Sequence, residues 1–212
     1  MEKFVKNVKQ STEIRQAALV EAALRLAAQR SPVDITTGDL AQAVGITQGA
    51  VFRHFSSKEA VWLAVLDWTA DTLMRRLQSA ADDELAKLDK LAPLAALQAV
   101  FMAHVDFVVS HPGVPRVIFQ ELQHAQDTAL KARVRGLMQQ YRKLLMILLE
   151  HAQAQCLLAP GTDREAAAVL FVGSVQGLVM QSLISGEVSD MAQQAPGVYK
   201  IYLRGLALKE TP

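Results

Sequence analysis

The stretch Thr36-Thr37-Gly38-Asp39-Leu40-Ala41-Gln42-Ala43-Val44-Gly45-Ile46-Thr47-Gln48-Gly49-Ala50-Val51-Phe52-Arg53-His54-Phe55 decides the fold of the N-terminal part of the chain. It predicts two short helices separated by a turn at Gly45, because glycine readily takes the left-handed conformation that ends a helix. Thr36 and Asp39 form a variant of the capping box, and Thr47 is a typical N-cap for the second helix. Two helices joined in this way are a helix-turn-helix, which places its second helix in the DNA major groove.

The first turn of the second helix carries the residues that we expect to meet bases. Gln48 is the best candidate for a hydrogen bond to a base edge, while Gly49 and Ala50 allow close approach and the Ala50 methyl suits a thymine methyl. The side chains that fit phosphate contacts are Thr36, Thr37, Thr47, His54 and Lys58. Phe52 and Arg53 complete the candidate DNA-binding set. The threonines can be caps only, or caps and phosphate ligands at once, because a helix N-terminus also offers free N–H groups to an anion.

The run from Arg15 to Leu66, about a quarter of the chain, resembles the DNA-binding domain of TetR/AcrR-type transcriptional regulators. The matching pieces are Leu19-Val20-Glu21-Ala22-Ala23-Leu24, Thr36, Leu40-Ala41, Val44-Gly45-Ile46-Thr47, Phe52-x-x-Phe55 and Lys58-Glu59. Their order and spacing are more specific than a helix-turn-helix pattern alone. The resemblance implies an all-α protein, with a three-helix DNA-binding domain in residues 1–58 and a larger helical domain in residues 59–212 that binds an effector and dimerises.

Three residues depart from the family pattern. Phe52 stands where the family usually has a tyrosine whose hydroxyl reaches a phosphate, so the resemblance implies weaker DNA binding or a larger contribution from His54 and Lys58. Ala27 replaces a common phenylalanine, which leaves less bulk in the first helix. Ser31 replaces a common glycine, so the turn after that helix must take another form.

Composition and charge narrow the class of protein. A net charge of +1 over 212 residues argues against a protein that coats nucleic acid with its whole surface. Cys156 is the only cysteine, which excludes a disulfide framework and a Cys-x-x-Cys pair; we expect it to be packed rather than redox-active. Residues 1–11 lack the apolar core of a signal peptide, so a cytoplasmic protein is expected. Lys3, Lys6 and Lys9 fit a solvated tail better than an arm on DNA.

The chain reads as helical from end to end. Beyond the helix-turn-helix at about 36–54, helices are expected at about 12–29, 56–80, 93–110, 117–123, 128–155, 163–186 and 197–208. We expect Ser56 and Glu59 to form the capping box of the fourth helix. Residues 166–186 carry no charge and could span a bilayer, but their serines and glutamines favour a helix buried in a soluble oligomer, with no membrane partner.

The resemblance implies that the middle helices enclose a pocket for a small-molecule effector. The candidate ligand-binding residues are Trp62, Leu66, Phe101, His104, Val105, Phe119, Gln123, Met138, Tyr141 and Leu145. Any one of them also fits plain core packing. The spacing of His104, His111 and His124 matches no standard ligand pattern, so neither a metal nor another cofactor is expected.

The uncharged helix is the candidate dimer interface. Gly173 and Gly177 lie four residues apart on one face, with Ser174 and Gln181 close by. Small residues allow two helices to approach, although tight packing within one subunit would also explain them. The resemblance implies a homodimer formed by the last two helices. Two recognition helices about 34–36 Å apart would then read a palindromic double-stranded operator.

The sequence therefore predicts a ligand-responsive transcriptional regulator, most simply a repressor released from DNA by a small, largely apolar effector. We expect the fourth helix to couple the two domains through Phe55 and Trp62. An enzyme is not expected, because no nucleophile–base pair, phosphate loop or paired metal ligands appear. The alternative is a DNA-binding regulator controlled by a partner protein without a small-molecule effector, and an interior without a cavity would favour it.

Overall fold

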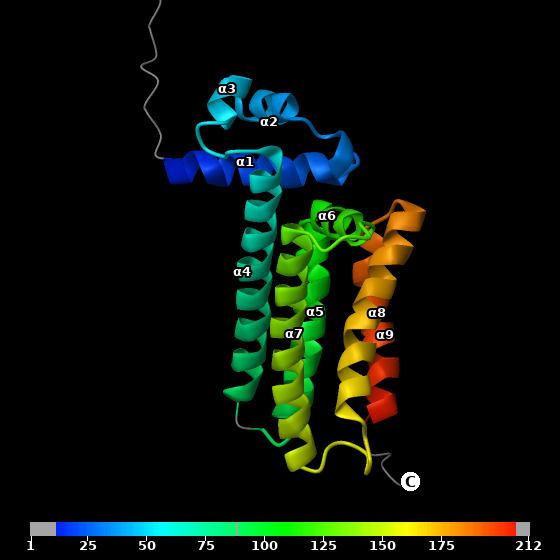
Figure 1. Ribbon diagram of the computed structural model, residues 1–212. Coiled ribbons are helices and arrows are strands. Elements are labelled where there is room, and N and C mark those ends of the chain that lie inside the picture. The colour runs from blue at the N-terminus through cyan, green and yellow to red at the C-terminus, as the bar shows by residue number, and fades with distance from the viewer. Residues whose placement is uncertain (1–11, 88, 207–212) are drawn as a thin grey trace, which may run out of the picture.

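The computed structural model describes residues 12–87 and 89–206, and within these ranges the protein is all-α (Figure 1). The helices are α1 (Thr12–Gln29), α2 (Thr37–Val44), α3 (Gln48–Val51), α4 (Lys58–Leu85), α5 (Ala92–Ser110), α6 (Gly113–Leu122), α7 (Ala129–Ala154), α8 (Arg164–Ser185) and α9 (Ser189–Leu206), with a short 3-10 helix, η1, at Pro32–Asp34. This confirms the predicted fold class. Lys3, Lys6 and Lys9 lie outside the described residues.

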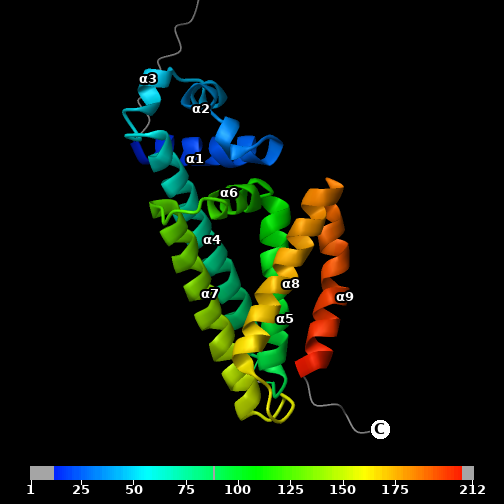
Figure 2. The ribbon, with the colours of Figure 1, turned by 45° about the vertical axis from the view of Figure 1, so that its right-hand side comes forward.

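The molecule has a small helical domain at one end of a long bundle. Helices α1, α2 and α3 form this domain, which we call the DNA-binding cap, and α4, α5, α7, α8 and α9 form the bundle. In Figure 1, α1 lies across one end of α4, with α2 and α3 on the side of α1 that faces away from the bundle. Helices α4, α5 and α7 run side by side, α8 and α9 pair along one side, and the short α6 lies between α1 and the bundle (Figure 2). One continuous cluster of buried apolar side chains connects cap and bundle.

Local sequence signals build the helix-turn-helix as predicted. The hydroxyl of Thr36 accepts from the Asp39 N–H at 3.1 Å, and the Asp39 carboxylate accepts from the Thr36 N–H at 2.7 Å. Gly45 ends α2 with φ 69°, and the Thr47 side chain caps α3. A hydrogen bond from Arg30, with others from Thr36, holds the pKa of the Asp39 carboxyl well below its usual range.

Four expectations about local structure are corrected. The fourth helix is capped by Ser57 rather than Ser56, because Ser57 has the extended backbone of an N-cap and accepts from the Ala60 N–H. Helix α6 begins at Gly113, four residues earlier than expected. Helix α9 begins at Ser189, eight residues earlier than expected, and contains Pro196. Cys156 is exposed rather than packed, and follows α7 with φ 57°.

Two helices of the described residues, α5 and α8, are long and apolar enough to span a membrane by length and composition. Both also pack into the protein core. Phe101 of α5 and Phe171 of α8 are fully buried, with ring centroids 5.3 Å apart. A helix in the core of a bundle has the same length and apolar composition as a membrane span, and α5 and α8 pack as such core helices.

Candidate DNA-binding surface and effector cavity

The start of α3 is exposed at the outer end of the cap, farthest from the bundle (Figure 1). Val51 and Phe55 are buried and hold the helix against the cap core. Gln48 and Gly49 are exposed, and Ala50 is half-buried. The helix therefore presents the expected residues outward, and their contacts with bases remain predictions.

The base-reading candidate Gln48 is held by a neighbouring helix. Its amide Nε2 donates to the hydroxyl of Thr37 on α2, at 2.8 Å. This bond uses one of the two amide hydrogens and leaves the other, together with Oε1, for a base edge. Thr37 thus orients Gln48, a role beyond the phosphate contact that the sequence predicted.

Several candidate phosphate ligands have partners inside the cap. The hydroxyls of Thr36 and Thr47 accept hydrogen bonds from backbone N–H groups in the first turns of α2 and α3. Lys58 Nζ donates to the carbonyl of Val33 at 2.9 Å, and its two remaining hydrogens stay available. His54 Nδ1 is buried without a hydrogen-bond partner in the described part of the chain. Arg53 and Phe52 are exposed; phosphate contacts by this set remain predictions.

An apolar cavity of about 370 Å³ lies inside the bundle, walled mainly by α5, α6, α7 and α8. Its lining consists of Leu73, His104, Phe107, Val108, Val114, Pro115, Ile118, Phe119, Leu122, Lys131, Val134, Arg135, Leu137, Met138, Val172, Val175, Gln176 and Val179. A mostly apolar cavity of this size with few polar groups is typical of small-molecule sites.

Three predicted ligand-binding residues, His104, Phe119 and Met138, line this cavity. The other seven do not. Those in the surrounding core are Leu66, Phe101, Val105, Tyr141 and Leu145. Trp62 borders a separate hollow between α4, α6 and η1, and Gln123 is exposed at the end of α6. Helical periodicity identifies inward faces, but not which inward residues border a void, and it missed the α8 wall entirely.

One polar residue of the lining, His104, is paired with a residue in the core behind the wall. His104 Nδ1 lies 3.1 Å from the Tyr141 hydroxyl, which is itself buried. Burial lowers the pKa of His104 to about 4, so the imidazole is neutral near pH 7, and burial raises the pKa of Tyr141. Among the described residues, no group of histidine, cysteine and carboxylate side chains could hold a metal ion.

Two cations at the cavity lining are bound to the α6–α7 loop. Lys131 Nζ donates to the carbonyl of His124, and Arg135 pairs with Asp127 at 2.7 Å. Both therefore tie the loop to α7. Lys131 keeps its positive charge, because its partners are neutral carbonyls, and this charge lies where the cavity meets the loop.

Helix α6 contacts both functional regions, which the sequence analysis did not foresee. Val114, Ile118 and Phe119 line the cavity. Gly113, on the opposite face, packs so closely on α1 that an added Cβ would lie 2.1 Å from the Leu24 carbonyl oxygen. The sequence at this contact, His111-Pro112-Gly113, is typical of a break between helices and does not indicate the close approach of Gly113 to α1.

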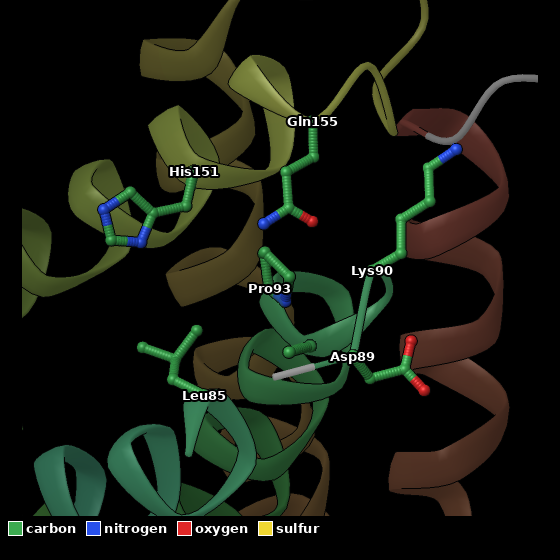
Figure 3. A pocket seen from close by; sticks show the side chains of 7 residues that line it. Leu85, Asp89, Lys90, Pro93, His151 and Gln155 are labelled. Atoms are coloured by element: carbon green, nitrogen blue, oxygen red, sulfur yellow. The ribbon is translucent and has the colours of Figure 1, made fainter. Parts of the chain in front are cut away.

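A further hollow, of about 500 Å³, lies at the end of the bundle far from the cap. It is lined by Leu85, Asp89, Lys90, Ala92, Pro93, His151 and Gln155. Figure 3 shows the charged Asp89 and Lys90 side chains pointing away from His151. Four of its seven lining residues carry a polar or charged side chain, so it fits an apolar effector less well than the bundle cavity.

The candidate dimer residues lie on the outward face of α8. Gly173, Gly177 and Gln181 are exposed and Ser174 is half-buried. An added Cβ at either glycine would meet nothing within 4 Å, so packing within the subunit does not explain them. Apolar side chains on the same face are also exposed, and these are Val169, Leu170, Met180 and Ile184.

A helix-turn-helix at one end of a helical bundle that encloses an apolar cavity defines a DNA-binding regulator. Residues 19–65 match the family model described as bacterial regulatory proteins, tetR family. Residues 117–196 match the model for a tetracyclin repressor-like C-terminal domain. The chain belongs to the tetR family of bacterial regulatory proteins, a family of transcriptional regulators rather than enzymes.

Similar proteins include the nucleoid occlusion factor SlmA of Glaesserella parasuis, 28% identical over 69% of this chain and 72% of that protein, and SlmA of Photobacterium profundum, 24% identical over 78% and 82%. Among solved structures, a regulatory protein TetR from Rhodobacter sphaeroides has a TM-score of 0.75 at 19% identity, covering 92% of this chain and 100% of that one. NalD, the secondary repressor of the MexAB-OprM multidrug efflux pump in Pseudomonas aeruginosa, has 0.67 at 20%, covering 95% and 100%. These structures establish the shared fold.

Proposed function

We propose that this regulator is a cytoplasmic, homodimeric repressor that binds a palindromic operator and is released by a small, largely apolar effector. The observation that carries the proposal is the position of α6. One face of this helix walls the cavity, and Gly113 on its other face touches the DNA-binding cap.

The position of α6 supports a population shift between two arrangements of cap and bundle. Gly113 approaches the backbone of α1 at Leu24 and Ala28 without an intervening side chain. A ligand that moves α6 must therefore either move α1 with it or separate α6 from α1. An effector would release the protein from DNA if it bound more tightly to the arrangement that does not fit the operator. The loss of operator affinity cannot exceed the ratio of the effector's affinities for the two arrangements.

The outward face of α8 supports a homodimer. Its glycines and exposed apolar side chains form a stripe at helical spacing, from Val169 to Ile184. A symmetric interface would bury this stripe, because a helix face can pair with itself across a twofold axis. Two copies of α3 would then be fixed at one spacing, which is what a palindrome requires.

Titration of a labelled DNA fragment from immediately upstream of its own gene tests the proposal, with fluorescence anisotropy as the readout and nonspecific competitor present. We expect competitor-resistant binding, a palindromic footprint the size of a dimer, and release by members of a library of small apolar compounds. Equal binding to the fragment and the competitor would contradict regulation at this site. Specific binding that no compound reverses would contradict the effector.

A second candidate is control by a partner protein. The similarity to nucleoid occlusion factors, at 24–28% identity, is the observation that favours it. The apolar cavity of about 370 Å³ counts against it, because a regulator without an effector has no need of a cavity. Retention of specific DNA binding in the presence of every compound, together with its loss on adding a purified cellular protein, would favour the partner.

A further inference from the structure

The chemistry of the cavity wall narrows the class of effector, an inference that rests on the proposed function. Four lining residues are polar: Lys131, Arg135, the exposed Gln176, and His104, which bonds to the Tyr141 hydroxyl in the core behind it. All the other lining residues are apolar. Whatever binds there must therefore satisfy the imidazole and otherwise offer apolar surface.

The hydrogen bond to Tyr141 fixes which tautomer of His104 faces the cavity. Within the described residues, the Tyr141 hydroxyl has no other hydrogen-bond partner than His104 Nδ1. If Nδ1 carried the proton, the buried phenol O–H would have no acceptor, which costs free energy. The phenol therefore donates to Nδ1, and the ring proton sits on Nε2. With Nδ1 occupied, Nε2–H is the donor left for the cavity.

Charge in the cavity excludes an ionised group at this position. Burial keeps His104 uncharged at neutral pH, because it lowers the pKa to about 4. The two cations of the lining, Lys131 and Arg135, bind the α6–α7 loop through His124 and Asp127, and they precede Tyr141 on α7 by about 15 and 9 Å along the helix axis. A carboxylate beside His104 would lose its hydration and gain only one neutral donor, and burying a charge in that way is strongly unfavourable.

The cavity volume gives the size of the part of a ligand that the bundle can surround, because the cavity also opens to solvent beside the exposed Leu122 and Gln176. A cavity of 150 Å³ in another protein accommodates benzene. By proportion, a cavity of about 370 Å³ holds roughly 15 non-hydrogen atoms.

We propose that the cavity binds an uncharged, mainly apolar molecule of this size, whose single carbonyl or ether-type oxygen accepts a hydrogen bond from His104 Nε2. Tyr141 is a positioning residue in this arrangement, since it acts only through the imidazole. Met138 and Phe119 supply apolar contact and take no part in recognising the oxygen.

Displacement of the uncharged fluorophore N-phenyl-1-naphthylamine from the full-length protein tests the proposal. Three competitors share one tail and differ in the head group: 2-decanone, decanoate and decylammonium. We expect 2-decanone to bind most tightly. His104→Phe should raise its Kd about tenfold, the usual effect of one neutral hydrogen bond, and leave fluorophore binding within about twofold.

Matched variants separate recognition from packing. Met138→Leu alters the same wall without changing a hydrogen bond, and should leave the order of the three competitors unchanged. His104→Gln keeps an N–H donor and should retain part of the preference for the ketone, which keeps the test valid if His104→Phe folds poorly. Tyr141→Phe removes the hydroxyl that holds the ring proton of His104 on Nε2. It should therefore weaken ketone binding severalfold.

The outcomes distinguish this proposal from the proposed function. Tighter binding of decanoate than of 2-decanone, or an unchanged ketone Kd in His104→Phe, would overturn the ligand class while the site itself stands. Failure of the fluorophore and all three competitors to bind would overturn both the ligand class and the effector-binding function.

Discussion

Replacing Gly113 by alanine tests the contact between α6 and the DNA-binding cap. The added Cβ would lie 2.1 Å from the Leu24 carbonyl oxygen and 3.0 Å from the Ala28 nitrogen. Both neighbours are backbone atoms of α1, which no rotamer change can move away. Ordinary contact begins near 3.4 Å, so the two helices must separate by about 1.3 Å.

That separation has a cost that can be measured. Overpacking of this kind destabilises a protein by about 1–3 kcal/mol, and in a chain of this size each kcal/mol lowers Tm by about 2–4 °C. We therefore expect Gly113→Ala to lower Tm by roughly 2–12 °C in calorimetry at fixed protein concentration. Gly136→Ala is the matched control, because its added Cβ meets nothing within 4 Å and alanine favours a helix.

The same variant tests coupling. If α6 transmits effector binding to α1, Gly113→Ala should change operator affinity and reduce the shift that effector produces, while Gly136→Ala leaves both unchanged. An unaltered Tm, together with wild-type operator affinity with and without effector, would show that the helices do not approach as closely as the structure has them.

Three further changes test other parts of the molecule. Thr37→Val removes the hydrogen bond that orients Gln48, and it should lower discrimination between operator and competitor DNA about two- to tenfold. Thr37→Ser keeps the hydroxyl and should not lower it. Equal discrimination by the wild type and both variants would contradict the orienting role. Ile184→Glu should shift sedimentation from dimer to monomer, because it places a charge in the α8 stripe, while Leu91→Glu, at another exposed apolar position, should leave the dimer intact; a dimeric Ile184→Glu protein would place the interface elsewhere. Asp39→Asn should lower stability to urea at pH 7, because a carboxyl whose pKa is depressed on folding stabilises the protein above its unfolded pKa; the difference from wild type should shrink as pH falls below about 4, and a constant difference would contradict the assignment.

The helix-turn-helix could be predicted residue by residue because its determinants are local. Thr36 and Asp39 act within three residues of each other, and Gly45 permits the positive φ that ends α2. The same local rule failed by one residue at the fourth helix only because two serines are adjacent, and Ser57 rather than Ser56 is the cap.

The cavity could not be predicted in the same way. Phe101 and His104 lie three residues apart on the inner side of α5, and both were chosen as ligand contacts. Phe101 packs against Phe171 and Tyr199, each at a centroid distance of 5.3 Å, and is sealed in the core. His104 instead borders the void. The difference comes from what α8 and α9 place opposite each residue, which no pattern within α5 records.

The uncharged stretch at residues 166–186 illustrates how burial resolves an ambiguous pattern. Hydropathy alone allows a membrane span or a helix buried on most sides. In the structure, one face of α8 is buried in the core and another face is exposed. Phe171 and Val175 are fully buried, whereas Val169 and Ile184 are more than half exposed. A helix that is apolar on its core face and again on its outer face has a second surface to bury. Glycines with open space above them, at 173 and 177, leave room for another backbone to approach, which is why we propose this face for the dimer interface.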